Sequence, residues 1–343
     1  MKENQKIKCL IWDLDNTLWN GVLLEDSRVL LRAGVTDVIK TLDGRGILQS
    51  VASKNSYEAA MAKLEEFGLN EFFLYPQINW NSKSSSIKAI VQEINIGMDA
   101  VAFIDDQDFE LEEVNYTLPE VRLIHAEMLE HIPDMPEMTP RFITEDSKLR
   151  RLMYKGDIQR KHVEEVFEGP QEEFLASLQM KLTISPLGEG DLQRAEELTV
   201  RTHQLNSTGY TYSYEELDKL RKSDRYKIFI AGLEDKYGTY GKIGLMLIEC
   251  LPEEWCIKLL LMSCRVMSRG VGTILLNYIM GCAQKAGVRL KADFVPNDRN
   301  RVMYVTYKFS GFKEIIENGE KIVFENDLRH IQPFPDYVKV SLG

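Results

Sequence analysis

The sequence predicts an α/β fold in two successive domains, the first built around a parallel sheet. Three observations support this prediction. Over the first third of the chain, short apolar runs alternate with helical patterns, which is typical of βαβ units. The length of 343 residues favours two domains over one. After a proline-rich segment, the alternation of strands and helices starts again near residue 180.

The first domain is predicted to span residues 1–131. Its first strand is expected at 9–15, where the apolar run CLIW leads into the acidic DLD. A helix is expected at 56–69, because Ser56 can cap its start and a glycine lies near its end. By the same criteria we expect the remaining strands at 46–54, 72–78, 100–107 and 120–126, and a helix at 85–96.

A linker is predicted at 132–179. It opens with three prolines in the ten residues 132–141 and continues with a charged helical stretch at 147–167. The second domain, 180–343, then restarts with the strand-like MKLTISPL. Its further elements are expected as helices at 191–206, 269–287 and 300–312, and as strands near 226–233, 242–250, 256–264 and 288–296.

Composition excludes several classes of protein. With 42 Lys and Arg against 53 Asp and Glu, the net charge of −11 argues against a general nucleic-acid binder. No apolar run approaches the ~18–20 residues of a membrane span, and no signal peptide is evident. The five cysteines are odd in number and lack the CxxC spacing of metal sites. We therefore expect a cytoplasmic protein with reduced thiols.

Polar residues follow successive predicted strands of the first domain. Asp13, Asp15 and Thr17 lie in DLDNT, Ser53 ends the next strand, and Lys83 precedes a helix. Each of these alone is better explained as a turn, cap or surface residue. Because ligands of open α/β sheets bind at the carboxyl ends of the strands, their order and placement favour an active site.

A third strand end carries the pair Asp105–Asp106. Asp13 could attack a phosphoryl group as nucleophile, and Asp15 could protonate the leaving oxygen and then activate water. Mg²⁺ would bind Asp13, the Asp15 carbonyl and Asp105 or Asp106, because it prefers oxygen ligands. Thr17, Ser53 and Lys83 would contact the phosphate, with Ser53 and Lys83 binding its equatorial oxygens.

This constellation resembles the haloacid-dehalogenase (HAD) superfamily of phosphatases, over residues 7–126 and with all four motifs in order. The resemblance implies a parallel Rossmann-like sheet. The short spacings from Asp15 to Ser53 and from Ser53 to Lys83 leave no room for a large cap domain. An open site of this kind suits a macromolecular substrate, or one that is passed on.

The second domain places Cys264 just before the loop RGVG, at the end of a predicted strand. A buried structural cysteine is the plain alternative. As a nucleophile, its thiolate would be favoured by Arg265 and by the helix that follows, while Gly270 and Gly272 would offer backbone N–H groups to a phosphate. His203 is a candidate general base and Asn206 a candidate contact to an acyl or pantetheine group, both from the polar segment RTHQLNSTGYTYS.

The order of elements in this domain resembles the GNAT acetyltransferase fold. Met267 stands where the phosphate-binding loop of that fold usually has Gln or Arg, which argues against ordinary use of acetyl-CoA. With WDLDNTLW, FIDD, RTHQLN, MSCRV and RGVG in order, nearly the whole chain resembles the FkbH-like family. That resemblance implies a glyceryl transferase and phosphatase. Such an enzyme captures the glyceryl group of 1,3-bisphosphoglycerate as a cysteine thioester, dephosphorylates it, and passes it to the phosphopantetheine arm of an acyl carrier protein in polyketide-type biosynthesis.

Two alternatives remain open at this stage: a Mg²⁺-dependent phosphatase with a GNAT-like module that only binds a partner, and an N-acyltransferase fused to a HAD domain. The basic segment 148–161 is a candidate docking patch for an acidic carrier protein, with Arg150 and Arg151 at its centre. A solvated linker face is the simpler interpretation of these charges.

Overall fold

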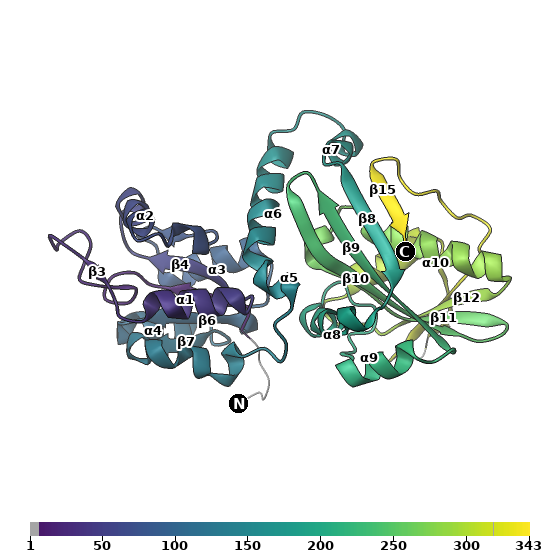
Figure 1. Ribbon diagram of the computed structural model, residues 1–343, viewed down its shortest axis with the longest axis horizontal. Coiled ribbons are helices and arrows are strands. Elements are labelled where there is room, and N and C mark those ends of the chain that lie inside the picture. Colours follow the sequence, from purple (N-terminus) through teal and green to yellow (C-terminus); the bar gives the residue numbers. More distant parts are fainter. Residues whose placement is uncertain (1–6, 318) are drawn as a thin grey trace. The chain divides into compact units, whose positions relative to one another are not determined.

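A computed structural model describes residues 7–317 and 319–343 (Figure 1). The chain divides into two compact units, unit 1 up to Lys155 and unit 2 from Gly156 to Gly343. The division falls inside the segment predicted as a linker. Within the described part of the chain, no helix combines the length and the apolarity needed to cross a membrane.

Unit 1 is built on a five-stranded parallel sheet with the order β5-β4-β1-β6-β7. Strand β1 (Cys9–Trp12) lies in its middle, between β4 (Leu48–Ser53) and β6 (Val101–Asp105). Every residue of β1 is buried, because both of its neighbours are strands and both faces of the sheet are covered. The outer strands are β5 (Gln77–Ile78) and β7 (Arg122–His125).

Local sequence signals explain two of the helices of unit 1. The Ser56 side chain accepts a hydrogen bond from the Ala59 backbone at the start of α2 (Tyr57–Glu66), and Ser82 does the same at the start of α3 (Lys83–Ile94). Two further helices were not predicted, namely α1 (Val35–Gly44) and α4 (Asp108–Thr117). Helices α3 and α4 pack against each other.

No large cap interrupts the described part of unit 1. Between β1 and β4 the chain forms only a hairpin, β2 (Trp19–Asn20) with β3 (Leu30–Leu31), followed by α1. Between β4 and α3 it forms α2, a short 3₁₀ turn and β5. The space above the carboxyl ends of the strands is therefore bordered by short connections.

The predicted strand at 72–78 is largely wrong. Asn70–Phe72 forms a 3₁₀ turn, and the extended pairing is limited to the two residues of β5 and an isolated bridge from Phe73 to Gln49. Phe72, Phe73 and Leu74 are nevertheless buried. The apolar run therefore reports burial at the sheet edge and not a strand.

Helices connect the two units along the chain. These are α5 (Glu145–Lys148), α6 (Arg150–Glu165) and α7 (Gln171–Ser177). The charged helical stretch predicted at 147–167 corresponds to α5 and α6. The boundary between the units falls within α6, so this helix contributes residues to both.

Unit 2 is built on an eight-stranded mixed sheet with the order β13-β14-β12-β11-β10-β9-β8-β15. Most neighbours are antiparallel, but β11 pairs with β12 in parallel, and so does the C-terminal strand β15 with β8. The strands are β8 (Met180–Pro186), β9 (Tyr226–Asp235), β10 (Gly238–Cys250), β11 (Glu254–Met262), β12 (Arg289–Phe294), β13 (Lys313–Glu317), β14 (Ile322–Asn326) and β15 (Val338–Leu342).

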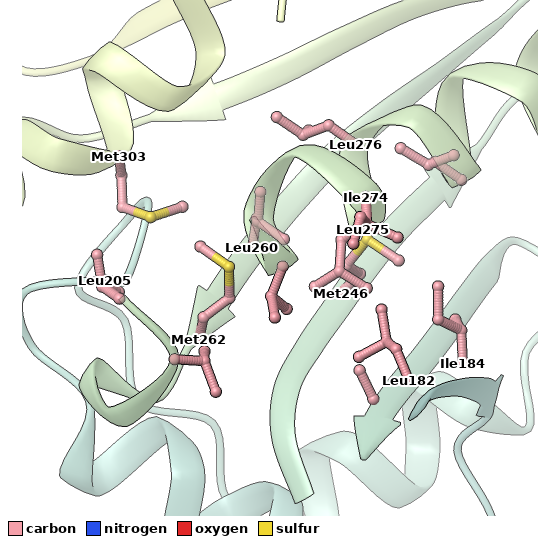
Figure 2. Packing of buried hydrophobic residues seen from close by; sticks show 14 of the residues in the cluster. Leu182, Ile184, Leu205, Met246, Leu260, Met262, Ile274, Leu275, Leu276 and Met303 are labelled. Atoms are coloured by element: carbon pink, nitrogen blue, oxygen red, sulfur yellow. The ribbon is translucent and has the colours of Figure 1, made fainter. Parts of the chain in front are cut away.

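Helices cover both faces of this sheet. Successive side chains of a strand point to opposite faces, so each central strand contributes to two buried clusters. In β11, Leu259 and Leu261 belong to one buried cluster, together with side chains of α8 (Leu192–Arg201) and α9 (Tyr214–Arg221). Leu260 and Met262 belong to the other, with α10 (Val271–Ala286). Figure 2 shows this second cluster, with Ile274 and Leu275 of α10 above the strands. The remaining helix is α11 (Arg301–Phe309).

The predicted fold class is thereby confirmed: a HAD-like parallel sheet without a large cap, followed by a GNAT-like α/β unit.

Candidate active sites

The first candidate site lies at the carboxyl edge of the parallel sheet in unit 1. Asp13 directly follows β1, and its backbone N–H donates to the Ile104 carbonyl at 3.0 Å, which continues the pairing of β1 with β6. Asp105 ends β6 and Ser53 ends β4, the two strands that flank β1. The topology therefore brings these three predicted residues to one edge.

A buried lysine joins the two carboxylates. Lys83 occupies the first turn of α3, is only 4% exposed, and its ammonium contacts Asp13 and lies 2.9 Å from Asp105. It also donates to the Ala52 carbonyl at 3.1 Å. Burial by itself lowers the pKa of an amine, but the two carboxylates outweigh it, so the pKa of Lys83 is raised. Lys83 therefore stays charged.

Three carboxylates of this edge could hold a metal ion. Asp13, Asp105 and Asp106 each offer an oxygen, and these oxygens lie within 4.8 Å of one another. Burial, followed by the charge of Asp13, raises the pKa of Asp105 to about 6 and also raises that of Asp106. The charge of Lys83 thus does not fully compensate these carboxylates. The all-oxygen donor set fits a hard cation such as Mg²⁺.

Thr17 and Ser53 flank this cluster. The Thr17 hydroxyl donates to Asp106 at 3.3 Å, so it orients this carboxylate. Both side chains are buried. Ser53 ends β4, so its hydroxyl lies at the same edge of the sheet as Asp13 and Asp105.

Asp15 is held by groups that the sequence interpretation missed. Its carboxylate accepts hydrogen bonds from Trp19 Nε1 at 2.7 Å, the Leu23 backbone at 3.0 Å and Asn55 Nδ2 at 2.9 Å. Burial, assisted by the charge of Asp13, raises its pKa despite these bonds. A raised pKa favours the protonated carboxyl that a general acid requires. Asn55 lies two residues after Ser53, and this spacing was the one signal in the sequence that could have identified it.

The second candidate site lies where β11 ends in unit 2. The strand stops at Met262, and Cys264 begins a 3₁₀ turn, Cys264–Val266, with a half-buried side chain. The chain then reaches Gly270, which caps α10. The predicted position of Cys264 between a strand end and a helix start therefore agrees with the structure.

His203 comes from a segment that runs antiparallel to the end of β11. Helix α8 ends at Arg201, earlier than predicted, and Asn206 forms an isolated antiparallel bridge with Leu261. The pairing is limited to this bridge, because His203 lies in a bend and β11 ends at Met262. The His203 side chain is exposed. Its service as a base to the thiol stays a prediction.

The side chain of Asn206 makes its hydrogen bonds within its own loop. Its amide nitrogen donates to the carbonyls of Thr202 and Tyr210, both at 3.5 Å, and its oxygen accepts from the N–H groups of Thr208 and Gly209 at 3.1 and 2.8 Å. The side chain is completely buried. Asn206 thus shapes the segment, and its predicted contact to an acyl or pantetheine group is not supported by this geometry.

The other predicted residues of this site differ in their surroundings. Arg265 donates through Nη2 to the Tyr240 carbonyl at 2.7 Å, so its guanidinium is anchored on β10. A Cβ atom on Gly272 would lie 3.0 Å from the Met262 side chain and 3.2 Å from Thr306, so this glycine allows close packing. Stabilisation of a Cys264 thiolate by Arg265 stays a prediction.

The two arginines at the centre of the basic segment 148–161 make contacts within unit 1. Arg150 is buried and donates to the Gly46 carbonyl at 2.9 Å. Arg151 pairs with Asp43 at 2.9 Å, and Arg160 is buried as well. These arginines are therefore engaged internally, whereas Lys148 and Lys161 of the same segment are exposed. A docking role for the segment stays a prediction.

Comparison with known proteins finds no matching family model and no matching curated protein. Among solved structures, one similar chain is the N-terminal part of protein BF1531 from Bacteroides fragilis, which contains a phosphatase domain complexed with Mg. It is 31% identical over 36% of this chain and 36% of that chain, with a TM-score of 0.31. The chain thus spans little more than a third of the length of that structure.

Other similar structures are acetyltransferases. The ribosomal-protein-S18-alanine N-acetyltransferase of Escherichia coli is 18% identical over 42% of this chain and 92% of that chain, with a TM-score of 0.34. The spermidine N-acetyltransferase of Vibrio cholerae, in complex with CoA and spermine, is 17% identical over 42% and 92%, with a TM-score of 0.32.

Proposed function

We propose that the chain is a bifunctional enzyme: a Mg²⁺-dependent phosphatase in unit 1 joined to a glyceryl transferase in unit 2. The observation that carries the proposal is the buried contact of Lys83 with Asp13 and Asp105 at the carboxyl edge of a parallel sheet. Burying one ammonium and two carboxylates is costly, and a phosphoryl group at this place would make use of all three.

In the phosphatase reaction, an Asp13 oxygen attacks phosphorus, and the bond to the ester oxygen breaks as Asp15 donates its proton to that oxygen. Asp15 then takes a proton from water, which attacks phosphorus and releases phosphate from Asp13. Lys83 and Ser53 hold the remaining phosphoryl oxygens. Asp13, Asp105 and Asp106 would hold Mg²⁺, which supplies further positive charge to the phosphoryl oxygens.

In the transferase reaction, the Cys264 thiolate attacks the carbonyl carbon of an acyl phosphate, and the C–O bond to phosphate breaks. With 1,3-bisphosphoglycerate this step yields a phosphoglyceryl thioester and inorganic phosphate. The thiol of a carrier protein's pantetheine arm then attacks the thioester and regenerates Cys264. His203 accepts the proton of the attacking thiol. The substrate and the carrier protein follow from the family resemblance.

The test separates the two reactions by substitution. We expect intact mass spectrometry to detect a covalent acyl adduct after incubation with 1,3-bisphosphoglycerate, and to find none in Cys264→Ala. Asp13→Asn should keep the adduct in its phosphorylated form and should lose phosphate release from p-nitrophenyl phosphate.

Cys282→Ala is the matched control, because it removes another half-buried thiol of unit 2. If no adduct forms while phosphate release is intact, the chain is a phosphatase whose second unit only binds a partner. Acetylation of an amine by acetyl-CoA would instead identify an N-acyltransferase.

A further inference from the structure

The C-terminal segment of the chain reaches the start of helix α10. Gly270 caps this 16-residue helix in the left-handed conformation, with φ +74°, and no side chain caps its first turn. A Cβ atom on Gly270 would collide with the Tyr337 hydroxyl and would lie 3.4 Å from Cζ of the same ring. The Tyr337 hydroxyl therefore lies directly against the Gly270 backbone.

The pairing of β15 with β8 positions Tyr337 at the helix start. Tyr337 immediately precedes β15, whose first residue Val338 pairs with Met180 of β8. The Val338 N–H donates to the Pro335 carbonyl at 3.2 Å, and Phe334 packs against the core of unit 2. The tyrosine is thus part of the folded unit and fixed at the helix start.

A buried arginine beside the same helix start has two N–H groups without a hydrogen-bond acceptor among the described residues. Arg269 is 8% exposed, and its Nη2 atom pairs with Glu164 at 3.0 Å. Its Nε and Nη1 atoms are buried, and neither has a hydrogen-bond acceptor among the described residues. Buried donors without an acceptor are rare, because each loses its hydration without compensation. These two N–H groups are suited to an anionic ligand.

Helix α7 brings negative charge to the same neighbourhood. Phe174 of α7 lies under the guanidinium of Arg269, 5.4 Å from its centre. Burial and the charge of Glu172, also in α7, raise the pKa of Tyr337, so its hydroxyl is neutral. Arg269 thus packs on α7, and Tyr337 lies close enough to α7 for the charge of Glu172 to act on its pKa.

We infer that Tyr337 is a specificity residue that keeps coenzyme A out of unit 2 by filling the anion-binding start of α10. The free N–H groups of a helix start and an adjacent arginine favour a phosphate, and a diphosphate needs the space that the Tyr337 ring and hydroxyl occupy. A thiol on a protein-bound arm does not carry the nucleotide diphosphate of coenzyme A. The inference rests on the proposed function for its acyl chemistry, and it explains why the unit would discriminate between the two thiols.

The test measures binding of coenzyme A alone, by isothermal titration calorimetry on the full chain. We expect Tyr337→Ala to bind coenzyme A about tenfold to a hundredfold more tightly than the unchanged protein, as one or two charge-assisted hydrogen bonds would provide. Tyr337→Phe should give a smaller gain, since it removes only the hydroxyl. Adding Arg269→Met to Tyr337→Ala should reverse the gain.

Tyr210→Ala is the control, because Tyr210 is an exposed tyrosine elsewhere in unit 2. The inference is wrong if the unchanged protein already binds coenzyme A as tightly as Tyr337→Ala, and equally if neither binds it. If Tyr337→Ala does not fold, as judged by circular dichroism, the affinity of Tyr337→Phe for coenzyme A is compared with that of the unchanged protein. Equal affinities would then contradict the inference. Failure of the proposed glyceryl transfer would instead appear as a missing mass adduct, which this titration does not measure.

Discussion

At the scale of single residues, Lys83 is the most informative side chain of the molecule. An ammonium that is 4% exposed would lose its charge in an apolar site, but here Asp13 and Asp105 keep it charged. The dependence is mutual, because the two carboxylates would otherwise face each other without a cation. Loss of this contact should therefore affect both the stability of the fold and the proposed phosphatase reaction.

We predict that Lys83→Met costs about 3–5 kcal/mol of folding free energy, because it leaves buried charges uncompensated. The same change should lower the rate of p-nitrophenyl phosphate hydrolysis by about 100-fold or more, since it removes a fixed positive charge from the phosphoryl site. Urea unfolding and a phosphate-release assay measure the two effects.

Lys88→Met is the control for this prediction, because Lys88 lies in the same helix with its side chain exposed. It should change neither quantity appreciably. Equal stability and equal activity of Lys83→Met and the unchanged protein would refute the assigned position of Lys83.

At the scale of secondary-structure elements, a buried ion pair fastens the second half of α6 to the sheet of unit 2. Arg160 Nε lies 2.7 Å from one oxygen of Asp235 in β9, and Nη2 lies 2.8 Å from the other. The guanidinium also stacks on the Tyr240 ring, 3.8 Å from its centre. Two parallel hydrogen bonds and a stacked ring fix the helix in both position and orientation.

We predict that Asp235→Ala destabilises the chain by about 3–5 kcal/mol, because the buried Arg160 loses both hydrogen bonds to Asp235 and keeps only its ion pair with Asp157, at 2.8 Å. Adding Arg160→Met should recover part of this loss, since the incompletely paired buried charge is then removed. Urea unfolding of the two single variants and the double variant gives the coupling energy.

The neighbouring pair of Lys181 and Glu234 is a matched control. Its atoms lie 3.1 Å apart between β8 and β9, beside Asp235 in sequence, but both side chains are exposed. Lys181→Ala should therefore change stability by less than about 1 kcal/mol. Similar costs for Asp235→Ala and Lys181→Ala would show that burial does not set the strength of the pair.

At the scale of the whole molecule, several buried acids bind their protons more tightly in the fold than in the unfolded chain. Burial, with the charge of Asp293, raises the pKa of the Cys256 thiol from 9.0 to about 12, and burial raises those of Tyr212 and Tyr278 from 10.0 to about 12. Above pH 9 the unfolded chain therefore loses protons that the folded chain keeps. By linkage, the fold loses stability as pH rises.

We predict that the free energy of unfolding falls between about pH 9 and pH 11, with a slope of up to about 1.4 kcal/mol per pH unit for each fully protected group. Cys256→Ala should make the decline shallower, because one of the groups that binds its proton more tightly in the fold is then removed. Urea titrations at several pH values measure these slopes. A decline that is as steep in Cys256→Ala as in the unchanged protein would contradict the role of this thiol.

The fold class and the strand-end site could be predicted because both depend on local spacing. An apolar run followed by an acid predicts a buried strand with a polar end, and parallel strands align such ends at one edge. Asp13, Lys83 and Asp105 come together for this reason. The prediction failed at 72–78, where a 3₁₀ turn buries the same apolar residues, because burial alone does not distinguish turn from strand.

The sequence by itself determined the α/β class, the order of the two units and the polar residues that meet at the carboxyl edge of the parallel sheet, because these follow from neighbours a few positions apart. Only the tertiary structure decided which charges are available to a partner. Arg160 and Asp235 are 75 positions apart in sequence, yet they share one buried pair. Tyr337 likewise reaches Gly270 only because β15 returns to pair with β8. Contacts of this kind depend on chain topology, and no local pattern records them.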